Sequence, residues 1–423
     1  MRVAVVGGGA AGLTSAWLLE VKHEVTLFEK DDRLGGHAHT VEIEVGGRRE
    51  TVDAGFQFFG TGEAYPTFNR LLDILAVQRT SYPTTVTLFG SDPRRPGSRR
   101  ALPMPPFRNG RPVWASLTPQ LLSDMIRFRA FLRRIPAFLE RDDTTMTVEE
   151  YLRDERLPAH FVDGFVFPLL LAFWCVDPAE FRGFAAYNAL YYLGANVPKG
   201  FATPRQTRVP GGIAVYIDAL IGDLRTTRLR PGTEVRRIER GGGGGYMVED
   251  ARGIRHSFDH IVVATNARQA LGLIEAIAEL EPVHEQLRRF EYFDTTIAIH
   301  GDRRLMPSDK SAWSVVNARW DGAHSSLSIW DPERGLPIFK SWVTFGERMP
   351  EPLYALARYE HGKVTPDYFD AQKRLRELQG GDGIWLAGLY THDADSHESA
   401  IRSAVAVAQR LAPESPRLRR LLG

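Results

Sequence analysis

The stretch RVAVVGGGAAGLTSAWLLEVKHEVTLFE, residues 2–29, decides the fold class of this chain. Residues 2–6 are nearly all apolar, which is typical of a strand covered on both faces. Residues 13–19 have helical spacing, and residues 23–29 favour a second strand. This order predicts a βαβ unit of about 30 residues.

A GxGxxG motif joins the first strand to the helix, and Glu29 closes the second strand. The first glycine permits a tight turn, the second lets backbone approach a pyrophosphate, and the third allows close packing of helix and strand. The helix N-terminus faces the negative charge, and Glu29 can bind a ribose diol. We therefore predict a dinucleotide site that includes Gly7, Gly9, Ala10, Ala11, Gly12, Glu29 and Lys30.

The residues after Glu29 distinguish NAD from FAD. Residues 33–37 read RLGGH, and residues 52–56 read VDAGF. With these elements the chain resembles the flavin-containing amine oxidase superfamily, including its phytoene-desaturase-like and protoporphyrinogen-oxidase-like members. The stretches GGHAHT, DAGFQFF, AYPTF and SHES resemble a bacterial group of NAD/FAD-binding, amine-oxidase-like proteins. The resemblance implies non-covalent FAD and adds cofactor-binding residues: Arg33, Gly35, Gly36, His37, Gly55 and Phe56.

The resemblance extends to the C-terminus, where it implies further cofactor-binding residues: Val235, Thr265, Gly388, Leu389, Ser396, His397 and Glu398. Three positions depart from the family pattern. One is Ser399, which fits the small residue expected after Glu398 but can form a hydrogen bond. His37 stands where the family often has arginine, so we expect FAD to bind more tightly at pH 6 than at pH 8. Leu389 stands where an aspartate often holds a ribityl hydroxyl, so Asp393 or a backbone group must replace it.

An aromatic run over residues 165–192 has two readings, either the core of a helical domain or the wall of an apolar chamber over the flavin. For the chamber we name Phe58, Phe59, Phe173 and Trp174 as substrate-pocket residues. As catalytic candidates we name Glu63, Tyr187 and Gln57. Hydride transfer to a flavin does not itself demand a general base.

Composition excludes several classes of protein. Lys and Arg number 53 against 52 Asp and Glu, so a nucleic-acid-wrapping protein is not expected. The single cysteine, Cys175, excludes a disulfide framework and a cysteine-rich zinc site, and we predict no metal.

The longest uncharged apolar stretch, residues 165–176, is shorter than the ~20 residues of a membrane span, so no stable membrane insertion is expected. No export signal is recognised at the N-terminus, and we expect a cytoplasmic protein.

Thr118 with Pro119, and Thr147 with Glu150, predict two helix starts. Helices are also expected at residues 366–379 and 398–411, and a strand near 227–238. The pattern of elements predicts an α/β fold in which a Rossmann-type FAD-binding domain is interleaved with an α+β substrate domain. Residues 1–75, 205–285 and 380–423 are assigned to the FAD-binding domain. Residues 76–204 and 286–379 are assigned to the substrate domain.

The predicted function is FAD-dependent two-electron oxidation of a small-to-medium, largely apolar substrate at a C–N or C–C bond. A redox-neutral, flavin-assisted isomerase or cyclase is one alternative, because the same scaffold supports both chemistries. A non-catalytic binding protein on a degenerate FAD fold is another, which Leu389 favours. The sequence leaves the oligomeric state open.

Overall fold

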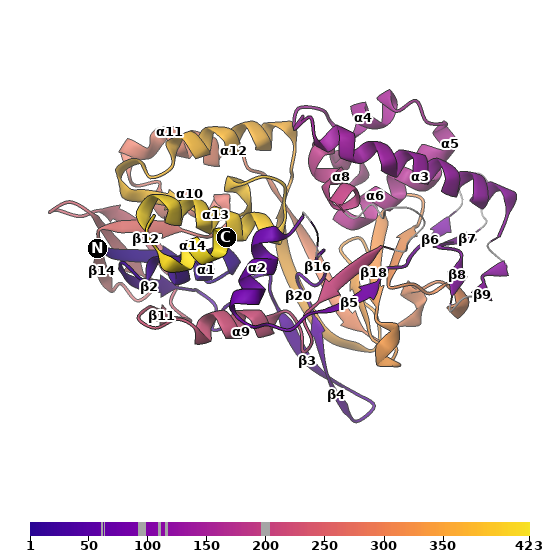
Figure 1. The fold of residues 1–423 in the computed structure, drawn as a ribbon, viewed down its shortest axis with the longest axis horizontal. Coiled ribbons are helices and arrows are strands. Elements are labelled where there is room, and N and C mark those ends of the chain that lie inside the picture. The colour runs from indigo at the N-terminus through magenta and orange to yellow at the C-terminus, as the bar shows by residue number, and fades with distance from the viewer. Residues whose placement is uncertain (61, 63, 92–98, 109–110, 115–116, 196–203) are drawn as a thin grey trace.

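The computed structural model describes residues 1–60, 62, 64–91, 99–108, 111–114, 117–195 and 204–423. Two β-sheets organise these residues, and Figure 1 shows them side by side with helices around and above them. Both chain termini lie on the side of the smaller, parallel sheet (Figure 1).

The parallel sheet contains the βαβ unit that the sequence predicts. Its strand order is β11-β2-β1-β15-β21, and every neighbouring pair is parallel. In this register Val3 lies between Val25 of one neighbour and His260 of the other. The bounds are β1 (Arg2–Val6), β2 (Glu24–Phe28), β11 (Arg228–Arg230), β15 (His260–Val263) and β21 (Ile384–Leu386).

The central strands of this sheet are apolar on both faces, so other elements cover both: Phe28 on one face packs edge-on against Phe258 of the strand at 255–258, and helices lie around the rest of the sheet. They are α1 (Ala10–Leu19), α2 (Pro66–Ile74), α9 (Ala214–Gly222), α10 (Ala267–Ile274), α11 (Glu281–Leu287), α12 (Pro366–Leu378), α13 (His397–Leu411) and α14 (Pro416–Leu422). A separate antiparallel sheet contains β12 (Val235–Arg240), β13 (Tyr246–Asp250) and β14 (Arg255–Phe258).

The second large sheet has seven strands in the order β20-β16-β19-β18-β17-β6-β7, and only the β6–β17 pair is parallel. Its bounds are β6 (Val86–Ser91), β7 (Arg99–Met104), β16 (Tyr292–His300), β17 (Val316–Trp320), β18 (Ser325–Trp330), β19 (Phe339–Trp342) and β20 (Leu353–Gly362). Three two-stranded pairs complete the strands: β3 (Thr40–Val45) with β4 (Arg48–Asp53), β5 (Thr80–Pro83) with β10 (Arg205–Arg208), and β8 (Phe107–Arg108) with β9 (Arg111–Pro112).

A group of helices lies beside the seven-stranded sheet: α3 (Pro119–Leu139), α4 (Val148–Asp154), α5 (Ala159–Phe161), α6 (Phe167–Trp174), α7 (Pro178–Arg182) and α8 (Ala186–Ala195). Their starts follow local signals in the sequence. The Thr118 hydroxyl accepts the Leu121 N–H, and Thr147 with Glu150 forms a complete capping box. Both helix starts were predicted and are confirmed.

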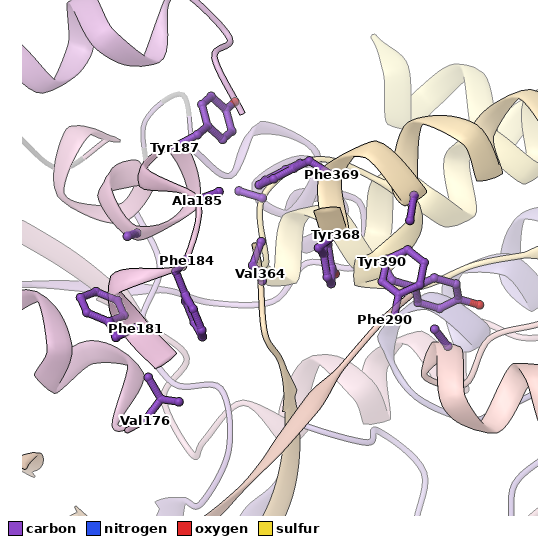
Figure 2. Close-up of a cluster of buried hydrophobic side chains, with 14 of the residues drawn as sticks. Val176, Phe181, Phe184, Ala185, Tyr187, Phe290, Val364, Tyr368, Phe369 and Tyr390 are labelled. Carbon is purple, nitrogen blue, oxygen red and sulfur yellow. The ribbon is translucent and has the colours of Figure 1, made fainter. Parts of the chain in front are cut away.

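The aromatic run over residues 165–192 contributes mainly to the core. Phe181 and Phe184 are fully buried, and Figure 2 shows them in a cluster that also contains Tyr368 and Tyr390 from the C-terminal part of the chain. Large aromatic side chains stabilise a core through the area they remove from water. The cluster therefore joins the helical group to the elements around α12.

The strands of the parallel sheet all come from residues 1–75, 205–285 and 380–423, and those of the seven-stranded sheet from 76–204 and 286–379. The parallel βαβ core confirms the predicted fold class. The exact division into two domains stays a prediction, and α12, placed with the substrate domain, lies beside α11 in Figure 1.

Candidate functional site

The turn between β1 and α1 needs two of its glycines for the fold itself. Gly7 has a φ of +108°, and a Cβ there would lie 2.6 Å from the Ala264 carbonyl oxygen. A Cβ on Gly12 would lie 1.8 Å from the Gly7 carbonyl oxygen. These contacts bring α1 against its strand, as a tight βα turn requires.

Gly9 is different, because the protein leaves room for a side chain there. Its φ is −77°, and the nearest atom to a built Cβ is the Gly36 Cα at 3.9 Å. Gly9 is the N-cap of α1, no side chain caps the helix, and the first turn has no acidic residue. The N-terminus of α1, which begins Ala10-Ala11, therefore offers its positive end to an anion.

Glu29 lies at the end of β2, directly beside this turn. Its Oε2 accepts the Gly8 N–H at 2.6 Å, and its Oε1 accepts the Asp31 N–H at 3.0 Å. The neighbouring Lys30 is exposed. The carboxylate is thus fixed at the edge of the anion site, where a ribose diol is expected.

A second glycine-rich loop packs against the first. The Gly35 N–H donates to the Gly8 carbonyl at 2.7 Å, and Gly36 lies opposite Gly9. The Arg33 guanidinium donates to the Leu34 and Gly36 carbonyls at 3.1 and 2.8 Å. Arg33 therefore shapes the loop that faces the anion site.

Gly55 and Phe56 pass close to His37. A Cβ on Gly55 would lie 1.9 Å from the His37 carbonyl oxygen, which also accepts the Phe56 N–H at 2.8 Å. The Phe56 ring stacks on the His397 imidazole, with centroids 4.2 Å apart. Three predicted cofactor segments, distant in sequence, therefore meet here.

The His37 imidazole lies between two residues of β20. It stacks on Tyr359 with centroids 4.6 Å apart and meets His361 edge-on at 5.6 Å. Within the described residues, no ring nitrogen of His37 or His361 makes a hydrogen bond. His37 is nevertheless exposed, so part of its surface is open to solvent or to a ligand.

Burial, assisted by nearby cations, lowers the pKa of His37 to about 4 and that of His361 to about 3. Both imidazoles are therefore neutral between pH 6 and pH 8. In the flavin-free protein, therefore, neither ring carries a positive charge in this pH range, and tighter binding of FAD at pH 6 stays a prediction.

Lys340 on β19 is a site residue that the sequence reasoning missed. It is buried, and its Nζ donates to the Gly55 carbonyl and to Gln57 Oε1, the latter at 3.5 Å. Burial lowers its pKa to about 8, while the neighbouring Asp53 opposes the shift. A lysine inside the apolar run IFKSW was the available signal.

Gln57, a predicted catalytic residue, also borders a polar pocket of about 290 Å³. Its walls include the PGG turn at residues 210–212 and the ion-paired side chains of Arg208, Asp331 and Arg334. The side chain of Gln57 thus contacts Lys340 and this pocket. Glu63, the other candidate from this region, lies outside the described residues.

The aromatic chamber stays a prediction, and the structure gives packing contacts for two of the residues named for it. The Tyr187 hydroxyl donates to Asp393 Oδ1 at 3.1 Å, and its ring packs edge-on against Phe369, as Figure 2 shows. Trp174 packs against Phe184, whereas Phe173 is 38% exposed at the end of α6. Tyr187 and Trp174 thus have packing partners that account for their positions without a substrate.

Two other pocket candidates belong to different surroundings. Phe59 is buried in the core beside the parallel sheet, against Phe56 and Phe68. Phe58 packs edge-on against Tyr82. Their roles as substrate contacts stay predictions.

The start of α13 is fixed by its own side chains. Ser396 caps the helix by accepting the Ser399 N–H at 3.1 Å, and His397 Nε2 is 2.7 Å from the Tyr216 hydroxyl. The Glu398 carboxylate accepts the N–H groups of Thr67 and Phe68 at 2.9 and 2.8 Å, so it caps α2. The cap on α2 gives Glu398 a structural role that does not require a cofactor.

The remaining predicted cofactor residues lie at strand ends. Val235 begins β12 and is buried, and the Thr265 hydroxyl donates to the Asn266 carbonyl at 3.2 Å. Gly388 has a φ of +144° and donates its N–H to Ser403 Oγ at 2.9 Å, with Leu389 beginning a short 3-10 turn. Asp393 Oδ1 accepts a hydrogen bond from the Tyr187 hydroxyl, and the replacement of the missing aspartate by Asp393 or by a backbone group stays a prediction.

These features fit FAD. The bare N-terminus of α1 suits a pyrophosphate, Gly9 leaves space that a Cβ would fill, and Glu29 stands beside it. On the far side of the two glycine loops, Gly55, Phe56 and His37 border the place where the resemblance puts the flavin.

Comparison with known proteins agrees with this fit. The family described as flavin-containing amine oxidoreductase matches residues 10–335. Coproporphyrinogen III oxidase of Mycobacterium tuberculosis is 28% identical over 291 residues, which is 65% of this chain and 61% of that protein. The chain thus spans less than two thirds of the length of this relative.

Solved structures share the fold over nearly the whole chain. Putrescine oxidase bound to putrescine is 14% identical, with a TM-score of 0.68 over 98% of this chain and 100% of that one. A CLA-producing fatty acid isomerase from P. acnes is also 14% identical, with a TM-score of 0.68 over 97% and 98%. The match over most of its length shows that the chain belongs to the flavin-containing amine oxidoreductase family.

Proposed function

We propose that this oxidoreductase removes a hydride from a small-to-medium, largely apolar substrate at a C–N or C–C bond, with FAD held non-covalently. When bound, FAD supplies the two-electron acceptor for that hydride. The observation that carries the proposal is the position of Lys340, which is buried and donates to the Gly55 carbonyl and to Gln57 Oε1, close enough to His361 to lower the pKa of that imidazole.

Loss of a hydride leaves a substrate that must also release a proton before a neutral double bond forms. A lysine with a pKa of about 8 is partly deprotonated near neutral pH, so Lys340 can accept that proton. The imidazoles of His37 and His361, with pKa values of about 4 and 3, are weaker bases. We assign the proton transfer to Lys340 and the shaping of an uncharged wall to the two histidines.

An uncharged wall favours an apolar substrate. Tyr359 and the two neutral histidines bring large rings to the space beside Gly55. Such a surface binds carbon skeletons through removal of apolar area from water, while few polar groups orient the reacting carbon. Gln57, which borders the polar pocket, is the group we assign to orienting a polar end of the substrate.

The test begins with the visible spectrum of the purified protein, which should show flavin released intact on denaturation. Candidate amines, unsaturated acids and isoprenoids are then added anaerobically, and bleaching of the flavin identifies a substrate class. Replacing Lys340 with Met should slow bleaching without loss of bound flavin, whereas Lys373→Met, at an exposed position on α12, should not. Product formed with no consumption of acceptor would instead favour the redox-neutral isomerase.

A further inference from the structure

One end of the molecule exposes large apolar side chains that the core does not use. Trp114 is 76% exposed and Ile126 is 72% exposed, and Phe107 and Leu122 are each about half exposed. Figure 1 shows that β8, β9 and α3, the elements at or beside these residues, lie together at the end farthest from the N-terminus. We call Phe107, Arg111, Trp114, Leu122, Ile126 and Arg133 the docking face.

The outward side of α3 follows from its helical spacing. Leu122, Ile126 and Arg133 are separated by four and seven residues and therefore share one side of the helix. The opposite side contains Leu121 and Ile135, which are buried in the core. The exposed apolar residues are thus a second apolar strip, beyond the one that folding requires.

Charge on this part of the chain is strongly one-sided. Residues 99–134 contain eight arginines and no lysine, against a single acidic residue, Asp124. Asp124 is buried and lies 3.7 Å from Arg127, so it adds no exposed negative charge. Arg111 and Arg133 are exposed. Arg134 is ion-paired with Glu155, so the docking face takes its positive charge from Arg111 and Arg133.

We propose that the docking face binds the surface of an anionic lipid bilayer. Tryptophan and phenylalanine favour the boundary between headgroups and acyl chains, and Leu122 and Ile126 would bury their side chains at the same depth. Arginine forms bidentate hydrogen bonds with lipid phosphates. No helix among the described residues is long and apolar enough to cross a membrane, so the contact is one of surface binding.

Neither the exposed apolar side chains nor the arginines would by themselves identify an anionic bilayer as the partner. A nucleic acid would use the arginines and leave Ile126 without a function, because phosphate contacts gain nothing from an exposed aliphatic side chain. An uncharged partner would use the apolar residues and give Arg111 and Arg133 no anion to bind. A bilayer with anionic headgroups uses both, with each kind of side chain at its own depth.

The test is cosedimentation of the full-length protein with phosphatidylcholine vesicles, with and without 30% phosphatidylserine. We expect binding to the anionic vesicles that weakens as salt is added, and little binding to the neutral ones. The double variant Trp114→Ser, Ile126→Ser should bind at least about tenfold more weakly, since burial of two large apolar side chains is lost. Arg111→Glu with Arg133→Glu should reduce binding to a similar extent.

The matched control is Ile254→Ser, which alters an exposed isoleucine between β13 and β14. It should bind anionic vesicles like the unchanged protein. Equal binding by the unchanged protein and the serine double variant would overturn the proposal, as would absence of binding to anionic vesicles. A dimer that the Ile126→Ser change dissociates would show instead that the docking face pairs with a second copy. These measurements need no substrate, so they are independent of the proposed reaction.

Discussion

Two glycines three residues apart should respond to alanine in opposite ways. At Gly12 a Cβ would lie 1.8 Å from the Gly7 carbonyl oxygen, and real Cβ atoms essentially never come within 3.0 Å of a heavy atom from a residue that is not a chain neighbour. The helix must therefore move away from its strand. At Gly9 the nearest protein atom is 3.9 Å away, so an added methyl group meets only the space where the pyrophosphate is expected.

The expected magnitudes separate the two variants. Overpacking of this kind costs about 1–3 kcal/mol, so Gly12→Ala should lower the melting temperature of the flavin-free protein by several degrees. For Gly9→Ala, alanine caps a helix less well than glycine but also restricts the unfolded chain. These effects oppose each other, and the flavin-free stability should change by less than about 1 kcal/mol. Affinity for FAD should nevertheless fall by at least about tenfold.

The assay compares melting of the flavin-free proteins with FAD affinity measured by quenching of flavin fluorescence. Gly9→Val, with a branched side chain, should abolish FAD binding. Retention of full FAD affinity by Gly9→Ala and Gly9→Val would refute the placement of the pyrophosphate at the start of α1. Equal loss of stability in Gly9→Ala and Gly12→Ala would contradict the geometry of the turn.

Three further outcomes are expected. The rate of anaerobic flavin reduction should rise with pH through about 8, because Lys340 must lose its proton, and Lys340→Met should flatten that profile. Glu398→Ala should lower the free energy of unfolding in urea by about 2–4 kcal/mol by leaving two N–H groups of α2 unpaired, whereas Glu414→Ala, at an exposed position, should change it little. Burial alone raises the pKa of Glu20, but hydrogen bonds from Thr226 and Arg417 outweigh it and bring the pKa from 4.5 to about 2. The resulting stability, about 3 kcal/mol, is present above pH 4.5 and should be lost as the pH falls toward 2; an unchanged acid profile in Glu20→Gln would contradict this.

Local signals predicted much of the fold. The βαβ unit, the capped starts of α3 and α4, and helices expected at residues 366–379 and 398–411 all occur, the last two as α12 and α13 within one residue at each end. The run 227–238 was expected to be strand, yet it forms two strands, β11 and β12, in different sheets. The Pro231-Gly232 turn was visible in the sequence, but the choice of sheet depends on which distant strand has a free edge.

The sequence by itself determined the dinucleotide turn, because its glycines and Glu29 act within one βαβ unit, and it indicated FAD through the elements that follow. The tertiary structure alone decided the charge state of His37 and the position of Lys340. The pKa of a side chain depends on the groups around it. Here β19 and β20 supply those groups, although they lie more than 280 residues from Gly55 and His37 in the sequence. The same holds for Glu398, which matches the family pattern in sequence but in the fold binds the N-terminus of α2.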